Sequence, residues 1–189
     1  MIKEAKTTYQ VDELIAKRWS ARAFSEKQIT KEEVLTLIEA ASWAPSSVNE
    51  QPWEYTYAFH GTEGFDKLWD LLSVGNQLWA KNASVLMMCT ANKLFAKSGE
   101  FNRHYMHDTG MANANLLTQA TSMDIFCHVL GGFDRFRTDD AFNITENKEV
   151  ICFIALGYLG DKELLEEPFK TREITPRSRK PLEEIAHQL

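Results

Sequence analysis

Apolar residues recur with a helical period in several stretches of this sequence, and the clearest of these follows Thr30. Thr30 and Glu33 form a capping box, and an apolar stripe then continues through Ala41. Pro45 stops the helix, because proline cannot continue the backbone hydrogen-bond pattern. The other stretches with a helical pattern are a short one that ends near Arg18, Phe65–Leu72 and His107–Met123.

Strand-like patterns separate these predicted helices. The segment from Glu54 alternates Tyr55, Tyr57 and Phe59 on one face, which is typical of a strand. The apolar runs that predict buried strands are Ser84–Thr90, Ile125–Leu130 and the run that begins at Ile151. Four strands with irregular helical connections favour an α+β fold over a doubly wound sheet. We therefore expect a mixed, largely antiparallel central sheet flanked by helices.

The chain shows no repeat, no low-complexity segment and no linker, which predicts one domain over residues 1–189. Its 44% hydrophobic content is enough for one sizeable core. The net charge of −6 argues against general binding to nucleic acid, which needs a basic surface. No apolar run is long enough to span a membrane, and the first ten residues lack a signal peptide. A cytoplasmic location is therefore expected.

Several kinds of site lack their sequence motifs. No glycine pattern marks a Rossmann site or a P-loop, and no G-x-S-x-G marks a serine nucleophile. His104 and His107 lie next to Asp108, but no further ligands have metal-site spacing, so no metal is expected. The cysteines form an odd, scattered set within apolar runs, and we expect them to be buried and reduced. They are Cys89, Cys127 and Cys152.

Two basic clusters lie far apart in this acidic chain. RWSAR (residues 18–22) follows the first helix, and residues 170–180 hold five basic residues against one acid, Glu173. Guanidinium groups form paired, charge-assisted hydrogen bonds with phosphate. Basic residues also favour helix C-termini, so each cluster alone has a structural explanation. Because residues 177–179 repeat the Arg-Ser-Arg composition of the first cluster, the two together suggest one shared anionic ligand.

A polar loop, WAPSSVNEQPWEY (residues 43–55), joins the capped helix to the first strand. Its hydroxyl and amide groups suit a ligand edge with alternating carbonyls and ring nitrogens. Serine and asparagine also cap and turn the backbone, so the loop alone leaves both interpretations open. The large aromatic side chains Trp43, Trp53 and Phe126 are expected in the core rather than against a cofactor.

Taken together, these segments resemble the nitroreductase family of FMN-dependent oxidoreductases. The matching segments keep the family order over nearly the whole chain. They are RWSARAF (18–24), WAPSSVNEQPW (43–53), GNQ (75–77), DTGMANANLLTQA (108–120), GGFD (131–134), IALGYLGD (154–161) and RSRKPLEEI (177–185). The resemblance implies an intertwined homodimer with two FMN molecules at its interface.

The resemblance also implies which residues contact FMN. Those that would hold its phosphate and ribityl chain are Arg18, Ser20, Arg177 and Arg179. Those that would reach the flavin held mainly by the other subunit are Pro45, Ser46, Ser47 and Asn49. Those that would lie around the ring are Arg22 at its pyrimidine edge, Asn76 at its polar edge, and the backbone of Gly131 and Gly132 near N5.

The implied activity is hydride transfer from NADH or NADPH to flavin N5, followed by reduction of a nitroaromatic, a quinone or an activated alkene in ping-pong turnover. No side chain is expected to act as a nucleophile or base. The alternatives are a relative that uses flavin for dehalogenation or flavin breakdown, and a flavin-binding or sensing protein without significant NAD(P)H oxidation. Trp19 and Trp79 stand where many relatives have a basic residue, and Trp79 puts one flavin contact in question.

Overall fold

The computed structural model describes residues 3–189, and its centre is an antiparallel sheet with the strand order β1-β2-β4-β3. The strands are β1 (Trp53–Phe59), β2 (Val85–Asn92), β3 (Ile125–Leu130) and β4 (Lys148–Tyr158). β2 and β4 pair at the middle of the sheet, where almost every residue of both strands is buried. The predicted α+β class is confirmed, and every pairing among these four strands is antiparallel.

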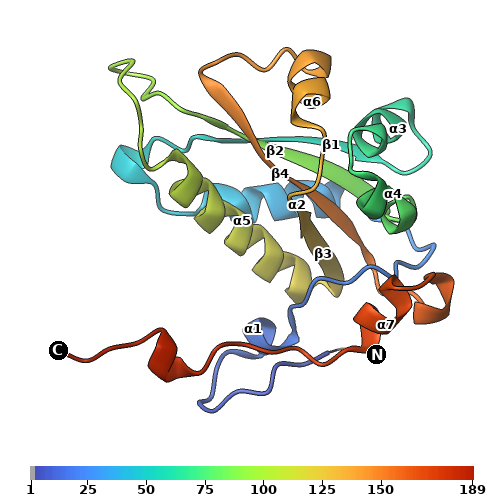
Figure 1. Cartoon of the computed structure of the whole chain (residues 1–189). Helices are drawn as coiled ribbons and strands as arrows, with labels where there is room; N and C mark the ends of the chain where they lie inside the picture. Colours follow the sequence, from blue (N-terminus) through green and yellow to red (C-terminus); the bar gives the residue numbers. More distant parts are fainter. Residues whose placement is uncertain (1–2) are drawn as a thin grey trace.

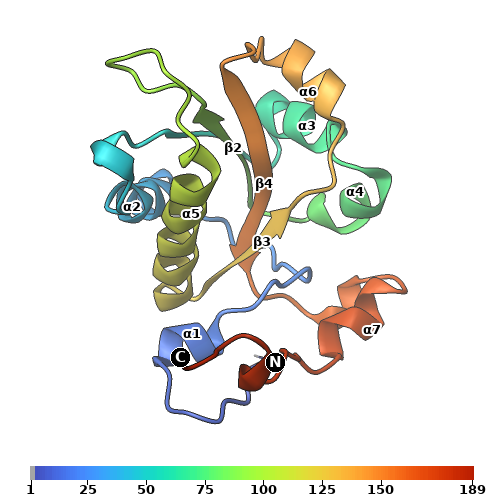
Figure 2. The same ribbon diagram turned by 60° about the vertical axis from the view of Figure 1, so that its left-hand side comes forward.

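Helices cover both faces of this sheet (Figures 1 and 2). The helices are α1 (Glu13–Lys17), α2 (Lys31–Ser42), α3 (Glu63–Asp70), α4 (Val74–Ala80), α5 (Tyr105–Ser122), α6 (Arg135–Ala141) and α7 (Phe169–Ile174). Short 3-10 turns are η1 (Ser47–Asn49), η2 (Lys162–Leu164) and η3 (Leu182–Glu184). Helices α2 and α5 pack on one face, and α3 and α4 pack on the other.

The two-residue period of β2 divides the core into two clusters. Val85, Met87 and Cys89 point toward α2 and α5, whereas Leu86 and Met88 point toward α3 and α4. Since β2 is covered on both sides, its residues 85–89 are continuously apolar rather than alternating. All three cysteines are free and buried, as the sequence predicts.

The predicted helix after Thr30 is confirmed, and Thr30 and Glu33 form both hydrogen bonds of the capping box. Helices α4, α6 and α7 were not predicted, because six or seven residues are too few to show a helical period. The core placement of Trp43 was wrong. Trp43 follows the last residue of α2, outside the buried stripe, and 79% of it is exposed.

No helix between residues 3 and 189 is long and apolar enough to cross a membrane.

Candidate functional site

The structure brings Arg18, Arg177 and Arg179 together in one pocket of about 320 Å³. Arg18 directly follows α1, and the backbone after α7 returns along that helix, as Figure 2 shows. Residues 5–7 form another wall of the pocket. Arg177 is held in place by donating from Nη1 to the carbonyl oxygens of Ala16, at 2.7 Å, and Lys3, at 3.0 Å. The two basic clusters of the sequence therefore meet in space.

The electrostatics of this pocket favour an anion. Burial lowers the pKa of Arg18, and the positive charge of Arg179 lowers it further. Burial likewise lowers the pKa of Arg177, with added repulsion from Arg18 and Arg179. None of the described residues that line the pocket is acidic. Three guanidinium groups that repel one another without a carboxylate form a site that a phosphate would stabilise.

Arg22 lies apart from the three-arginine pocket. Its guanidinium is 3.9 Å from a carboxylate oxygen of Glu173 and 5.8 Å from the ring centroid of Trp79. The other oxygen of Glu173 accepts hydrogen bonds from the backbone N–H groups of Arg22 and Ala23, both at 2.9 Å. The carboxylate therefore ties α7 to the segment that carries Arg18 and Ser20. Ser20 itself is exposed.

Asn76 and Gly132 are in direct contact. The Asn76 side chain donates to the carbonyl oxygen of Gly132 at 2.9 Å, and the Ser73 backbone N–H donates to the same oxygen at 3.0 Å. A Cβ on Gly132 would lie 2.8 Å from the side-chain ends of both Asn76 and Ser73, so a larger residue there would displace these two side chains. A Cβ on Gly131 would meet no atom within 4 Å, and this residue faces open space.

The polar loop containing Pro45, Ser46, Ser47 and Asn49 lies near the start of α5, whereas α1 lies near its end (Figure 1). Asp108 of α5 is buried and accepts a hydrogen bond from the Ser47 backbone N–H at 2.9 Å. The loop holds residues of positive φ, which require a tightly defined turn. They are Val48 (47°), Asn49 (60°) and Gln51 (52°). Within one protomer, this loop and the arginine pocket are separate sites.

Trp79 is buried in the core, with 1% exposed, and cannot contact a ligand. Its ring packs against His128 at 4.6 Å and Phe24 at 6.3 Å between centroids. The place that is basic in many relatives is therefore a packing position here.

Burial lowers the pKa of His128 from 6.5 to about 4, and the charges of Arg22 and Arg18 act in the same direction. The unfolded chain binds this proton below about pH 6.5, whereas the folded chain does so only near pH 4. Stability should therefore fall by about 2 kcal/mol between pH 6.5 and pH 4. Urea unfolding across this range measures the loss. The variant His128→Phe should flatten the slope, and an unchanged slope would assign the loss to other groups.

Sequence reasoning missed the two buried carboxylates that hold the candidate segments. Asp108 begins a segment that matches the family and lies beside a possible metal corner, but neither pattern predicts its hydrogen bond to the loop. Glu173 is the one acid among residues 170–180, and its position among basic residues is a sequence signal for a structural role. Its role depends on α7 folding back against residues 22–23, a long-range contact that no local pattern reveals.

Comparison with known proteins gives matches over most of the chain. The model of the nitroreductase family matches residues 15–158. A solved structure of an oxidoreductase containing FMN is 35% identical, covers 97% of this chain and 93% of its own, and superposes with a TM-score of 0.91. A nitroreductase family protein from Streptococcus pneumoniae TIGR4 shares the fold, with 22% identity, coverage of 94% and 98%, and a TM-score of 0.75.

A relative from Archaeoglobus fulgidus is 29% identical over 154 residues, which cover 79% of this chain and 86% of the relative. That protein is provisionally named an NADH dehydrogenase/NAD(P)H nitroreductase.

Proposed function

The chain belongs to the nitroreductase family, and from that premise we propose that it is an FMN-dependent oxidoreductase that takes electrons from NADH or NADPH. The electrons pass to a small, electron-poor acceptor such as a nitroaromatic, a quinone or an activated alkene. The observation that carries the proposal is the pocket where Arg18, Arg177 and Arg179 meet, with no acid among the described residues that line it.

The residues of this pocket fit the phosphate of FMN. The three arginines supply charge-assisted donors, and the adjacent Ser20 supplies an exposed hydroxyl that can donate to the phosphate or the ribityl chain. Asn76, already fixed by Gly132, has its amide oxygen available for a donor on the ring. The open space over Gly131 permits close approach of a flat ring to the backbone.

Arg22 has a different part in the proposal from the phosphate arginines. Trp79 is buried and uncharged, so it supplies no positive charge to a flavin. Arg22, which lies over the Trp79 ring, would supply that charge at the pyrimidine edge. Glu173 orients the Arg22 backbone, and the Arg22 side chain is 21% exposed. When bound, FMN would supply reversible two-electron chemistry, and positive charge near the ring would favour its reduced form. The side chains bind and orient, and none is assigned as a nucleophile or base.

We also propose that the chain works as a homodimer with FMN at the interface. The loop of residues 45–49 lies away from the arginine pocket of its own protomer, so a second copy is needed if both are to touch one flavin. The loop carries large exposed apolar side chains. They are Trp43, 79% exposed, and Val48, 81% exposed. Asp108 holds the loop in the shape it would present to the partner.

Trp43→Asp should weaken the proposed dimer by at least about 30-fold, because truncating an aromatic anchor at an interface costs roughly 2 kcal/mol. Analytical ultracentrifugation at graded concentrations measures the change. Leu164→Asp is the control, since Leu164 is also exposed, at 60%, but lies on η2 rather than beside the loop. A dimer that survives Trp43→Asp unchanged would exclude this residue from the interface.

An absorption spectrum of the purified protein, recorded without air before and after addition of NADH or NADPH, tests the proposed function. Flavin bands that bleach with one nucleotide support the reductase and identify its donor. Bands that persist with both nucleotides support a flavin-binding or sensing protein instead. A protein that shows no flavin bands even after incubation with FMN contradicts the cofactor assignment.

A further inference from the structure

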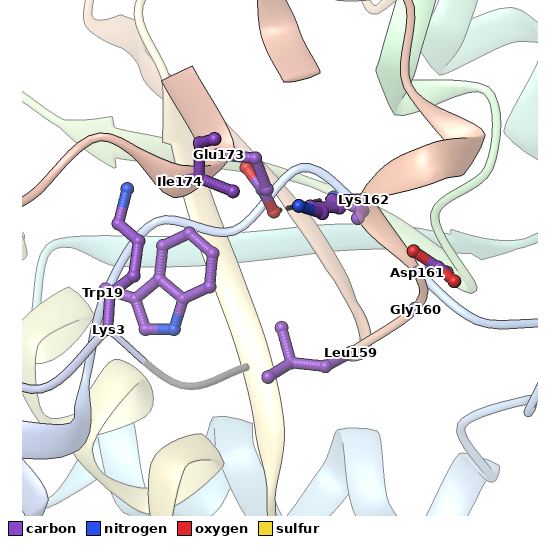
Figure 3. Close-up of a pocket in the computed structure, with 9 residues that line it drawn as sticks. Lys3, Trp19, Leu159, Gly160, Asp161, Lys162, Glu173 and Ile174 are labelled. Carbon is purple, nitrogen blue, oxygen red and sulfur yellow. Dashed lines mark hydrogen bonds between the residues drawn. The ribbon is translucent and has the colours of Figure 1, made fainter. Parts of the chain in front are cut away.

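A second pocket is lined by Trp19 of the RWSAR segment, and Figure 3 shows this side chain with the other labelled wall residues. It measures about 350 Å³, within the usual range for small-molecule sites. Trp19 and Lys3 stand on one side, and residues 159–161 stand opposite them, with Glu173 and Ile174 above. Arg18, Arg177 and Arg179 do not line this pocket, so it is distinct from the proposed phosphate site.

Two buried polar atoms of this pocket lack a partner among the described residues. The indole N–H of Trp19 has no acceptor, and Trp19 is 4% exposed. Oxygen Oε2 of Glu173 accepts no hydrogen bond from a described residue, although the Arg22 guanidinium lies 3.9 Å away, and Glu173 is 5% exposed. Such groups are rare in folded proteins, because an unsatisfied buried polar atom costs about 1–3 kcal/mol. Both atoms belong to side chains that line the same cavity.

The remaining wall residues define the chemistry that would satisfy these atoms. The Lys3 ammonium donates to the Arg172 carbonyl oxygen and lies 4.6 Å from the centroid of the Trp19 ring, and Lys162 also lines the pocket. Two ammonium groups and an indole N–H can donate to a carboxylate, and Asp161 and Glu173 are the two acids of the wall. The free oxygen of Glu173 favours a hydroxyl or amino donor. Apolar walls from Leu159 and Ile174 leave room for a short alkyl group.

We propose that this pocket binds a small α-hydroxy or α-amino carboxylic acid, with its carboxylate toward Trp19 and Lys3 and its hydroxyl or amino group toward Glu173. The site is independent of the proposed flavin chemistry and requires no FMN. Because Trp19 is flanked by Arg18 and Ser20, and Glu173 holds the Arg22 backbone, an occupant would nonetheless stiffen the segment that lines both pockets.

The test is a titration of the full 189-residue chain, as isolated, with L-lactate and L-alanine, followed by the indole N–H signals in a ¹H–¹⁵N spectrum. The variant Trp19→Phe assigns the Trp19 signal. We expect that signal to shift saturably, with a Kd of about 1 mM for a ligand of this size. Comparison of the affinities for L-lactate and L-alanine shows whether the pocket prefers a hydroxyl or an amino group beside Glu173. Propionate, which has the same carbon skeleton without the donor, should bind about tenfold more weakly.

Glu173→Gln replaces the negative charge of this side chain, and with it the 3.9 Å ion pair to Arg22, by a neutral amide. Its remaining oxygen can still accept from the backbone N–H groups of Arg22 and Ala23, whereas the free oxygen becomes a donor. We expect binding of L-lactate or L-alanine to weaken about tenfold or more, and far-UV circular dichroism checks that the variant remains folded. The proposal is overturned if neither probe saturates the Trp19 signal by about 20 mM. It is also overturned if Glu173→Gln binds as tightly as the parent.

Discussion

Replacing Arg18 with methionine is expected to lower the affinity for FMN by about two orders of magnitude. Removal of one charged partner from a partly buried, hydrogen-bonded ion pair costs roughly 2–5 kcal/mol. Arg18 carries part of the positive charge of the pocket, and methionine keeps much of its length without the guanidinium. Titration of the apoprotein with FMN, followed by quenching of flavin fluorescence, measures the change.

The control for Arg18→Met is Lys81→Met, which removes one cation from the exposed turn after α4. It changes the net charge equally but leaves the three arginines intact, so the affinity for FMN should stay within about twofold of the parent. An Arg18→Met protein that binds FMN like the parent would mean that the phosphate is held elsewhere. Equal losses in both variants would instead point to general electrostatic attraction.

Trp79→Ala is expected to destabilise the fold by roughly 3–5 kcal/mol, the range for deleting a buried tryptophan side chain. The ring fills the space between Phe24 and His128, and its loss leaves a cavity beneath the segment that carries Arg22. Urea unfolding followed by circular dichroism measures the free energy of unfolding.

Trp79→Phe is the companion variant, since a phenyl ring retains part of the contact with both neighbours. It should lose less than half of the stability that Trp79→Ala loses. If both variants unfold with nearly the same free energy as the parent, the ring is not packed as described. Trp79 would then be available to contact a ligand. This is the role expected of the basic residue that many relatives have at this position.

Elements with strong local signals could be predicted from the sequence. Helix α2 has a capping box and an apolar stripe that agree with its tertiary burial, and its bounds follow from them. Helix α4 has no comparable signal, because its seven residues include Gly75 and the exposed Val74 and Leu78. It is held by Trp79, which packs on residues distant in the sequence, and a local pattern does not encode that contact.

The candidate site shows the same division. Shared composition predicted that the two arginine clusters serve one anion, and the structure places Arg18 with Arg177 and Arg179. The family resemblance already set Arg22 apart from the phosphate arginines, but its contact with Glu173 could not be predicted, because that contact depends on where α7 lies. The flavin contacts of the loop at residues 45–49 depend on a second copy of the chain and remain predictions.

The closure of the arginine pocket by the segment after α7 sets an order of events during synthesis. A ribosome that has completed β4 has made every strand of the sheet, but Arg177 and Arg179 are still to come. A nascent chain at this stage has the scaffold and only one of the three phosphate arginines. If FMN binds as proposed, it can therefore be held by all three arginines only after residues 177–179 have been made.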